Sequence, residues 1–165
     1  MKDAKSFEIK KQLVMEAYKR VKANQGAAGI DDVSILDFEQ KLRDNLYKIW
    51  NRMSSGCYLP DPVKLVEIPK TGGGKRPLGI PTVEDRVAQM VVVMTIEPEI
   101  EPHFHEDSYA YRKNKSAHDA LAKAKDRSYL FHWVVDLNIK GFFDNIDHNL
   151  LIKALEKHVK CKWAM

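Results

Sequence analysis

The sequence predicts an α+β fold in which helices outnumber strands. Three observations carry this prediction. Apolar residues recur at helical spacing through much of the chain, two β-rich runs flank a glycine-rich turn, and a third run at 130–138 alternates apolar and polar residues. At 165 residues the chain can bury one ordinary core or two small ones.

The N-terminal third is expected to form two helices. The first covers roughly 6–23, where apolar residues share one face, and ends at a loop over 24–31 that contains two glycines. The second begins at Ser34, because Asp37 three residues later completes a capping-box-like start. Gly56 is the expected end of this second helix.

Three further helices are predicted in the rest of the chain. Thr82 is the expected cap of one that Pro98 ends. Ser116 opens the next, and the last starts at Asp147 or Asn149.

The two β-rich runs, 63–68 and 76–80, predict a hairpin whose tip at 71–75 is rich in glycine. Lys70 and Arg76 lie near opposite roots of this turn. Lys supplies a point charge, Arg a bidentate fork, and the tip free backbone N–H groups, so a triphosphate suits the arrangement. The alternative is an exposed hairpin whose glycines serve only the turn.

A loop at 108–118 interleaves aromatic and basic side chains. Such side chains can stack on bases or sugars and bind phosphates. The alternative is a polar loop whose tyrosines pack inward. The residues concerned are Tyr109, Tyr111, Arg112, Lys113 and Lys115.

An acidic segment follows, in which 130–138 is predicted to be a buried strand. Asp136 and Asn138 share one face of this strand, and Asp144 and Asp147 follow in the turn. Carboxylate oxygens are suitable ligands for Mg²⁺, although the second acidic strand that a two-metal site requires is not evident. Each acid also has a structural alternative: a helix cap for Asp147, an ion pair for Asp144 and a surface position for Asp136.

Composition favours a protein that meets a phosphate backbone. The net charge is only +4, but basic residues cluster at 1–25 and 109–130. Solvated helix faces would explain such clusters as well. Cys57 and Cys161 are too few for a disulfide framework or a four-cysteine zinc site. With no apolar run of membrane-spanning length and no signal core, we expect a cytoplasmic protein without membrane contact.

Four segments, in order, resemble the reverse transcriptases encoded by group II introns. NQGAAGID at 24–31 resembles their N-terminal extension motif. The segment from Tyr58 to Gln89, which contains IPKTGGGKRPLGIPTVEDRVAQ, resembles their fingers. SYAYRKNKSAHDAL at 108–121 resembles the next block, and VVDLNIKGFFDNIDH at 134–148 resembles the first palm strand. The resemblance covers most of the chain.

This resemblance implies the fingers and a partial palm of a right-handed polymerase. The fingers, with the N-terminal extension motif, would occupy 1–127, and the start of the palm 128–165. The implied activity is RNA-directed DNA synthesis by an enzyme that also assists intron splicing and mobility. The implied partners are group II intron RNA or an RNA template and primer, with dNTP and Mg²⁺ in the intact enzyme.

The resemblance also assigns roles to individual residues. The incoming nucleotide and the templating base would be contacted by Lys70, Arg76, Ile80, Pro81 and Arg112. RNA would be contacted by Gly29, Tyr111, Lys113 and Lys115. Phe143 matches the aromatic gate that crowds a ribose 2′-OH and favours deoxynucleotides.

One position departs from the family pattern. The first metal-binding Asp of the family falls on Asn138, whereas Asp136 lies two residues earlier. A neutral amide is a poor ligand for Mg²⁺, so Asp136 is the remaining candidate metal ligand. The Tyr-Ala-Asp-Asp hairpin, the thumb and the maturase domain of the family are not present in the sequence.

We therefore expect the chain to be a fragment that is inactive in synthesis. The alternative is a non-catalytic RNA-binding module, and a purely structural or protein-interaction domain is a third, less favoured reading. Because the strand at 130–138 would lack its neighbours, we also expect a homodimer.

Overall fold

The computed structural model describes residues 8–161 and 163–164. The chain packs as two units, one running through Ile96 and the other from Glu97 to Trp163. Helices dominate both units, and the first also holds a two-stranded antiparallel sheet. The helix-rich α+β fold is thus confirmed.

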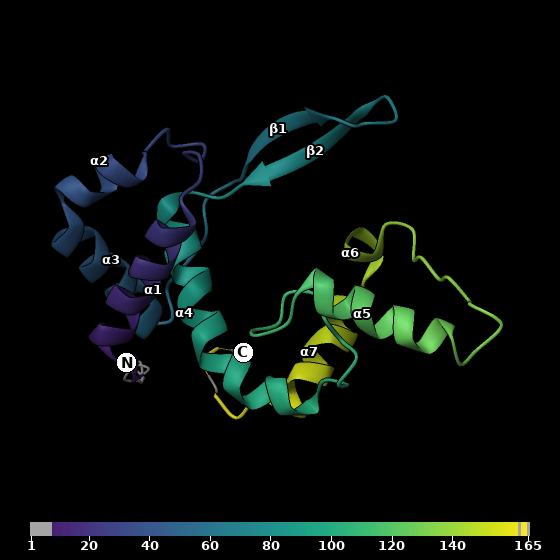
Figure 1. The fold of residues 1–165 in the computed structure, drawn as a ribbon. Coiled ribbons are helices and arrows are strands. Elements are labelled where there is room, and N and C mark those ends of the chain that lie inside the picture. Colours follow the sequence, from purple (N-terminus) through teal and green to yellow (C-terminus); the bar gives the residue numbers. More distant parts are fainter. Residues whose placement is uncertain (1–7, 162, 165) are drawn as a thin grey trace. The chain divides into compact units, whose positions relative to one another are not determined.

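The first unit is built on α1 (Lys11–Asn24), α2 (Ile35–Gln40), α3 (Leu42–Ser54) and most of α4, which starts at Val83 and ends at Ile100 (Figure 1). Each helix contributes an apolar stripe to one core, as the helical spacing predicts. The rings of Tyr18 and Phe38 stack in this core with centroids 5.8 Å apart. Its buried apolar residues include Val14, Ala17, Val21, Leu46, Ile49, Met53, Val83, Val87, Ala88 and Val91.

The helix predicted from Ser34 to Gly56 is divided in two at Lys41. The capping box of Ser34 and Asp37 forms as predicted and starts α2. At Lys41 the backbone leaves the helical region (φ −123°, ψ 37°), which ends α2 and allows α3 to start in a new direction. The side-chain amide of Asn45 donates to the carbonyl oxygen of Phe38 at 2.9 Å, so this acceptor is satisfied across the break.

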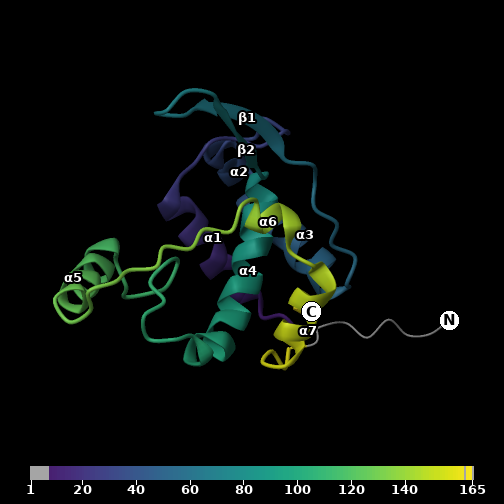
Figure 2. The ribbon, with the colours of Figure 1, turned by 90° about the vertical axis from the view of Figure 1, so that its right-hand side faces the viewer.

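The predicted hairpin is present as β1 (Lys64–Pro69) and β2 (Lys75–Ile80). The strands pair from Lys64 opposite Ile80 to Pro69 opposite Lys75. The tip is closed by the Lys70 N–H donating to the Gly74 carbonyl at 3.0 Å. Two views at right angles both show the hairpin projecting beyond the N-terminal end of α4 (Figures 1 and 2).

Thr82 caps α4 as predicted, since its hydroxyl accepts a hydrogen bond from the Asp85 N–H at 3.1 Å. The predicted end of this helix at Pro98 is wrong, because the helix continues to Ile100. A proline removes one backbone donor, and this loss is small where the helix is about to end. The chain then tightens into the 3₁₀ turn η1 (Glu101–His103).

The second unit contains α5 (Ala117–Ser128), α6 (Phe142–Asn145) and α7 (His148–Glu156). The predicted start of α5 at Ser116 is confirmed, with both hydrogen bonds of a capping box to Asp119. The last helix is capped by Asp147, whose carboxylate accepts from the backbone N–H groups that follow it. Among the described residues of this unit, Val159 alone is buried.

The strand predicted over 130–138 does not form. That segment is irregular and its side chains are exposed, including Trp133 at 90% and Leu137 at 85%. A strand needs a neighbour to accept its backbone hydrogen bonds, and between residues 8 and 161 the only strands that pair are β1 and β2.

None of the described helices is both long enough and apolar enough to cross a membrane.

Candidate functional site

One face of the hairpin presents two cations. Lys70 follows β1 and Arg76 lies opposite Ile68 on β2, and strand alternation turns both side chains to the same side. Both line a cavity of about 520 Å³ together with the apolar side chains of Ile68 and Leu78. Within the described part of the chain, neither cation forms an ion pair. The hairpin therefore offers two positive groups to one ligand.

The other face of the same hairpin is electrically balanced. Lys75, adjacent to Arg76 in sequence, points to the opposite side and pairs with Glu67 at 2.6 Å. The space around the tip is open, because Cβ atoms added at Gly72 and Gly73 would have no described neighbour within 4 Å. Strand alternation thus sorts the bases of this turn into a paired face and an unpaired face.

Behind the hairpin, the loop that follows α1 lies against the start of α4. Gly29 is buried there, and a Cβ at this position would lie 2.6 Å from the Cα of Thr82 and 3.0 Å from the carbonyl carbon of Pro81. Ile80 and Pro81 form the junction between β2 and α4 at the same place. The structure therefore brings three sequence-predicted residues together, although Gly29 itself is covered.

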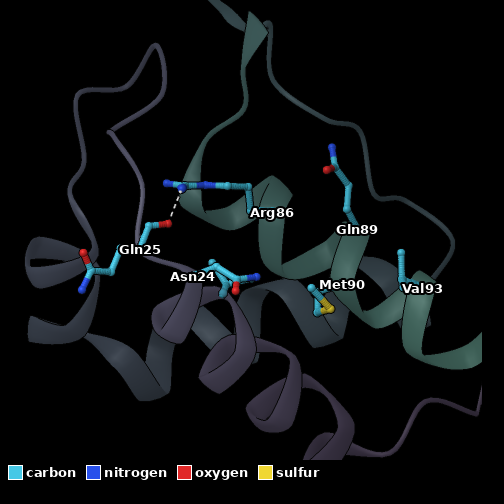
Figure 3. A pocket seen from close by; sticks show the side chains of 7 residues that line it. Asn24, Gln25, Arg86, Gln89, Met90 and Val93 are labelled. Atoms are coloured by element: carbon cyan, nitrogen blue, oxygen red, sulfur yellow. Dashed lines mark hydrogen bonds between the residues drawn. The ribbon is translucent and has the colours of Figure 1, made fainter. Parts of the chain in front are cut away.

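Arg86 fixes this loop to α4. Its terminal nitrogens donate to the carbonyl oxygens of Gln25 at 3.3 Å and Ala27 at 2.8 Å. Figure 3 shows the side chain extended from α4 toward the loop, with Asn24 and Met90 beneath it. Gly26 is needed beside the guanidinium, since a Cβ there would lie 2.5 Å from Nη1 and φ is +119°.

A buried carboxylate ties the entry of the hairpin to its exit. Asp85 is 3% exposed and accepts from the hydroxyl of Tyr58 at 2.7 Å, the N–H of Asp61 at 3.2 Å and the hydroxyl of Thr82 at 2.9 Å. Burial, and secondly the bond to Asp85, raises the pKa of Tyr58. The segment before β1 is thus anchored to the helix that follows β2.

A second contact supports the same anchor at the surface. Arg52 of α3 donates to Glu84 at 2.7 Å and to the carbonyl oxygen of Leu59 at 3.2 Å. The guanidinium carbon also lies 5.1 Å from the ring centroid of Tyr58. Both ends of the hairpin are therefore bound to the helical core.

In the second unit, Arg112 organises the loop in which it lies. Its Nε and Nη2 both donate to one carboxylate oxygen of Glu101, at 2.8 and 2.7 Å, while Nη1 donates to the carbonyl oxygens of His105 and Ser108. The side chain is only 11% exposed. These four hydrogen bonds engage most of the donors of the guanidinium.

The neighbouring residues point outward. Tyr111 is fully exposed in a left-handed conformation (φ 59°), so its ring is free to contact a ligand. Lys113 pairs with Glu97, and Lys115 donates to the Glu106 carbonyl and lies 4.8 Å from the ring centroid of Tyr109. This part of the second unit is an aromatic and basic surface.

The acidic segment does not gather a metal site. Asp136 and Asn138 are exposed in the irregular segment, and Phe143 is 80% exposed on α6 beside Phe142. Across the described ranges, no three His, Cys, Asp or Glu side chains come close enough together to hold a metal ion. An exposed carboxylate and an exposed amide outside any such group do not fit Mg²⁺, whose protein ligands are clustered hard oxygens.

Asp85 and Arg86 are among the residues that were not singled out from the sequence. Asp85 had a local signal, because Thr82 and Asp85 have the spacing of a capping box. Arg86 had none, since its contacts join residues about 60 positions apart in the chain. Only the fold reveals that this arginine holds the loop.

Comparison with known proteins identifies the chain. The reverse transcriptase (RNA-dependent DNA polymerase) family matches residues 68–164. Protein YkfC of Escherichia coli (strain K12) is 33% identical over 151 residues, which cover 87% of this chain and 40% of that protein. Group II intron-encoded protein LtrA of Lactococcus lactis subsp. cremoris is 36% identical over 148 residues, covering 87% of this chain and 24% of the relative.

A relative from yeast shows the same pattern. The putative COX1/OXI3 intron 1 protein of Saccharomyces cerevisiae is 27% identical over 150 residues, covering 91% of this chain and 18% of the relative. The chain thus spans between 18% and 40% of the length of these relatives. It belongs to the reverse transcriptase (RNA-dependent DNA polymerase) family, and the predicted resemblance to its group II intron-encoded members is confirmed.

Proposed function

We propose that this chain forms the fingers (1–127) and the first palm segment (128–165) of a group II intron-type reverse transcriptase. In this proposal the hairpin face with Lys70 and Arg76 binds the triphosphate of an incoming dNTP. The observation that carries it is that both cations line one cavity while Lys75, between them in sequence, is paired on the other face. Ile80 and Pro81 would meet the templating base at the base of the same hairpin.

Binding of a fluorescent dNTP tests the hairpin. Lys70→Ala and Arg76→Ala should each weaken binding by about 10- to 150-fold, because each removes a charge-assisted contact of roughly 1.5–3 kcal/mol. Lys75→Ala is the matched control, since it removes a cation from the paired face. Equal losses in all three variants would mean that net charge, and not the arranged face, attracts the nucleotide.

RNA binding is the second part of the proposal. The loop at Gly29 and the exposed side chains of Tyr111, Lys113 and Lys115 would contact group II intron RNA or an RNA template and primer. The engaged donors of Arg112 favour a role in shaping that loop over direct phosphate contact. The splicing assistance implied by the family resemblance would depend on this surface.

A salt series with structured intron RNA and an unrelated RNA tests this part. Lys115→Ala should flatten the slope of log affinity against log salt by about one if it contacts a phosphate. Lys125→Ala, which removes an exposed lysine from α5, should leave the slope unchanged if contacts are local. Equal affinity for the two RNAs, together with unchanged salt slopes in both variants, would remove the support for intron recognition.

We further propose that the 165-residue chain does not synthesise DNA by itself. Asn138 occupies the register of the metal-binding Asp, and among the described residues Asp136 belongs to no group of three side chains that could hold a metal ion. Mg²⁺ in the intact enzyme would supply charge neutralisation at the phosphates, with Phe143 next to the sugar. Primer extension with the purified chain, dNTP and Mg²⁺ should give no product, and product formation would contradict this assignment.

A non-catalytic RNA-binding module remains the second candidate, favoured by the same departure at Asn138. Tight intron RNA binding without measurable dNTP binding would select it. A cytoplasmic location stays part of the proposal for both candidates.

The exposed apolar segment supports a homodimer. Trp133, Val134 and Leu137 are each at least 80% exposed, and apolar stretches of this kind mark interfaces. Light scattering at micromolar concentration should give twice the chain mass. A monomeric mass would contradict the dimer without affecting the ligand assignments.

A further inference from the structure

A second cavity, separate from the hairpin face, lies where the loop after α1 meets α4. It measures about 210 Å³ and is lined by Val21, Asn24, Gln25, Arg86, Gln89, Met90 and Val93. We call it the loop–helix pocket (Figure 3). Its volume is well above what a single water molecule requires.

Arg86 holds one wall of the pocket in place. The terminal nitrogens of Arg86 are taken by the carbonyl oxygens of Gln25 and Ala27. Its Nε is buried and has no hydrogen-bond partner among the described residues. The chain therefore covers Nε, and Arg86 contributes to the pocket by holding the loop against α4.

The remaining lining has the chemistry of a base-reading site. Asn24 and Gln89 are exposed amides, each able to donate and accept at once, as the edge of a nucleobase requires. Val21, Met90 and Val93 supply apolar contact for the face of a ring. A phosphate fits less well, because Arg86 is the only cation among the seven lining residues and two of its nitrogens are already engaged.

We propose that the loop–helix pocket holds one unpaired nucleobase of a bound single-stranded nucleic acid. Arg86 is the positioning residue that fixes the loop, and the amides of Asn24 and Gln89 contact the base edge. The inference rests on the proposed binding of an RNA strand by this chain and adds a site on the first unit where one base is selected.

The test uses the full chain and short single-stranded oligonucleotides carrying one abasic position, which is moved along the strand. Stacking of one base contributes about 5- to 100-fold in affinity, so one position should be markedly more sensitive than the others. Matching RNA and DNA oligonucleotides show which strand supplies the base. A sensitive position in either strand supports the pocket.

Variants then assign that position to the pocket. Gln89→Ala and Asn24→Ala should each lower the affinity for the intact oligonucleotide by about 2- to 10-fold and reduce the effect of the abasic position. The salt slope should stay unchanged, because no charge is removed. Gln12→Ala, which removes an exposed amide from α1 outside the pocket, is the matched control.

Val93→Trp, which fills the pocket from a residue that is 44% exposed, should abolish the sensitive position without unfolding the chain. Retention of wild-type affinity and of the sensitive position in all three pocket variants would overturn the inference alone. Failure of the unmodified chain to bind any oligonucleotide would overturn both the inference and the proposed RNA binding.

Discussion

Tyr58→Phe removes a single oxygen atom, yet we expect it to lower the free energy of unfolding by about 2 kcal/mol. The lost hydroxyl donates to the carboxylate of Asp85 at 2.7 Å, and that carboxylate is 3% exposed. A hydrogen bond to a charged group contributes roughly 1.5–3 kcal/mol. Asp85 keeps its two other donors, Asp61 and Thr82, so the loss is limited to one bond.

Asp85→Ala should cost more, about 3–5 kcal/mol, because it leaves the Tyr58 hydroxyl and the Asp61 N–H without an acceptor. The double variant should be less unstable than the sum of the two single variants. The expected coupling energy is roughly 1.5 kcal/mol, within the range for residues in direct contact.

Urea unfolding followed by far-UV circular dichroism measures all three variants. Tyr47→Phe is the matched control, since its side chain is 54% exposed and its hydroxyl has no described hydrogen bond. It should change stability by less than about 0.5 kcal/mol. A coupling energy below about 0.5 kcal/mol would refute the argument that this pair anchors the hairpin.

Three other perturbations follow from the described contacts. Gly29→Ala should destabilise the first unit by roughly 1–3 kcal/mol in urea, because its Cβ meets backbone that cannot move aside, whereas Gly72→Ala, which enters open space, should be close to neutral. Arg112→Ala should expose its loop to limited proteolysis, since four hydrogen bonds disappear together; an unchanged cleavage pattern would contradict that role. Burial raises the pKa of Tyr58 above its usual value of 10.0. Above pH 10 the Tyr58 hydroxyl therefore stays protonated in the folded state while it ionises in the unfolded state. Stability should therefore fall above pH 10 by about 1.4 kcal/mol per pH unit, and less steeply in Tyr58→Phe.

Features governed by neighbouring residues could be predicted from the sequence. The capping residues Ser34, Ser116 and Asp147 start helices where expected, because a cap bonds to backbone groups within three positions. The hairpin follows for the same reason, since its turn and pairing are contained within the segment from Lys64 to Ile80.

Features that depend on distant residues could not be predicted in this way. The alternation at 130–138 is typical of a strand, but a strand forms only beside another strand. The division at Lys41 depends on how α2 and α3 pack, and the contacts of Arg86 join segments about 60 residues apart. The resemblance to a family predicted candidate roles, while the separation of Lys75 from Arg76 required the register of the two strands.

The register of the hairpin also sets a rule for changes in its length. The glycines at the tip are the suitable place for added residues, because no described atom lies within 4 Å of a Cβ added at Gly72 or Gly73. One residue inserted inside β2 between Arg76 and Leu78 would instead move every side chain on one side of the insertion to the opposite face of the hairpin. It would separate Arg76 from the apolar wall that Leu78 gives to the same cavity. Engineering of this protein can therefore vary the reach of the hairpin freely at its tip, but only in steps of two residues along its strands.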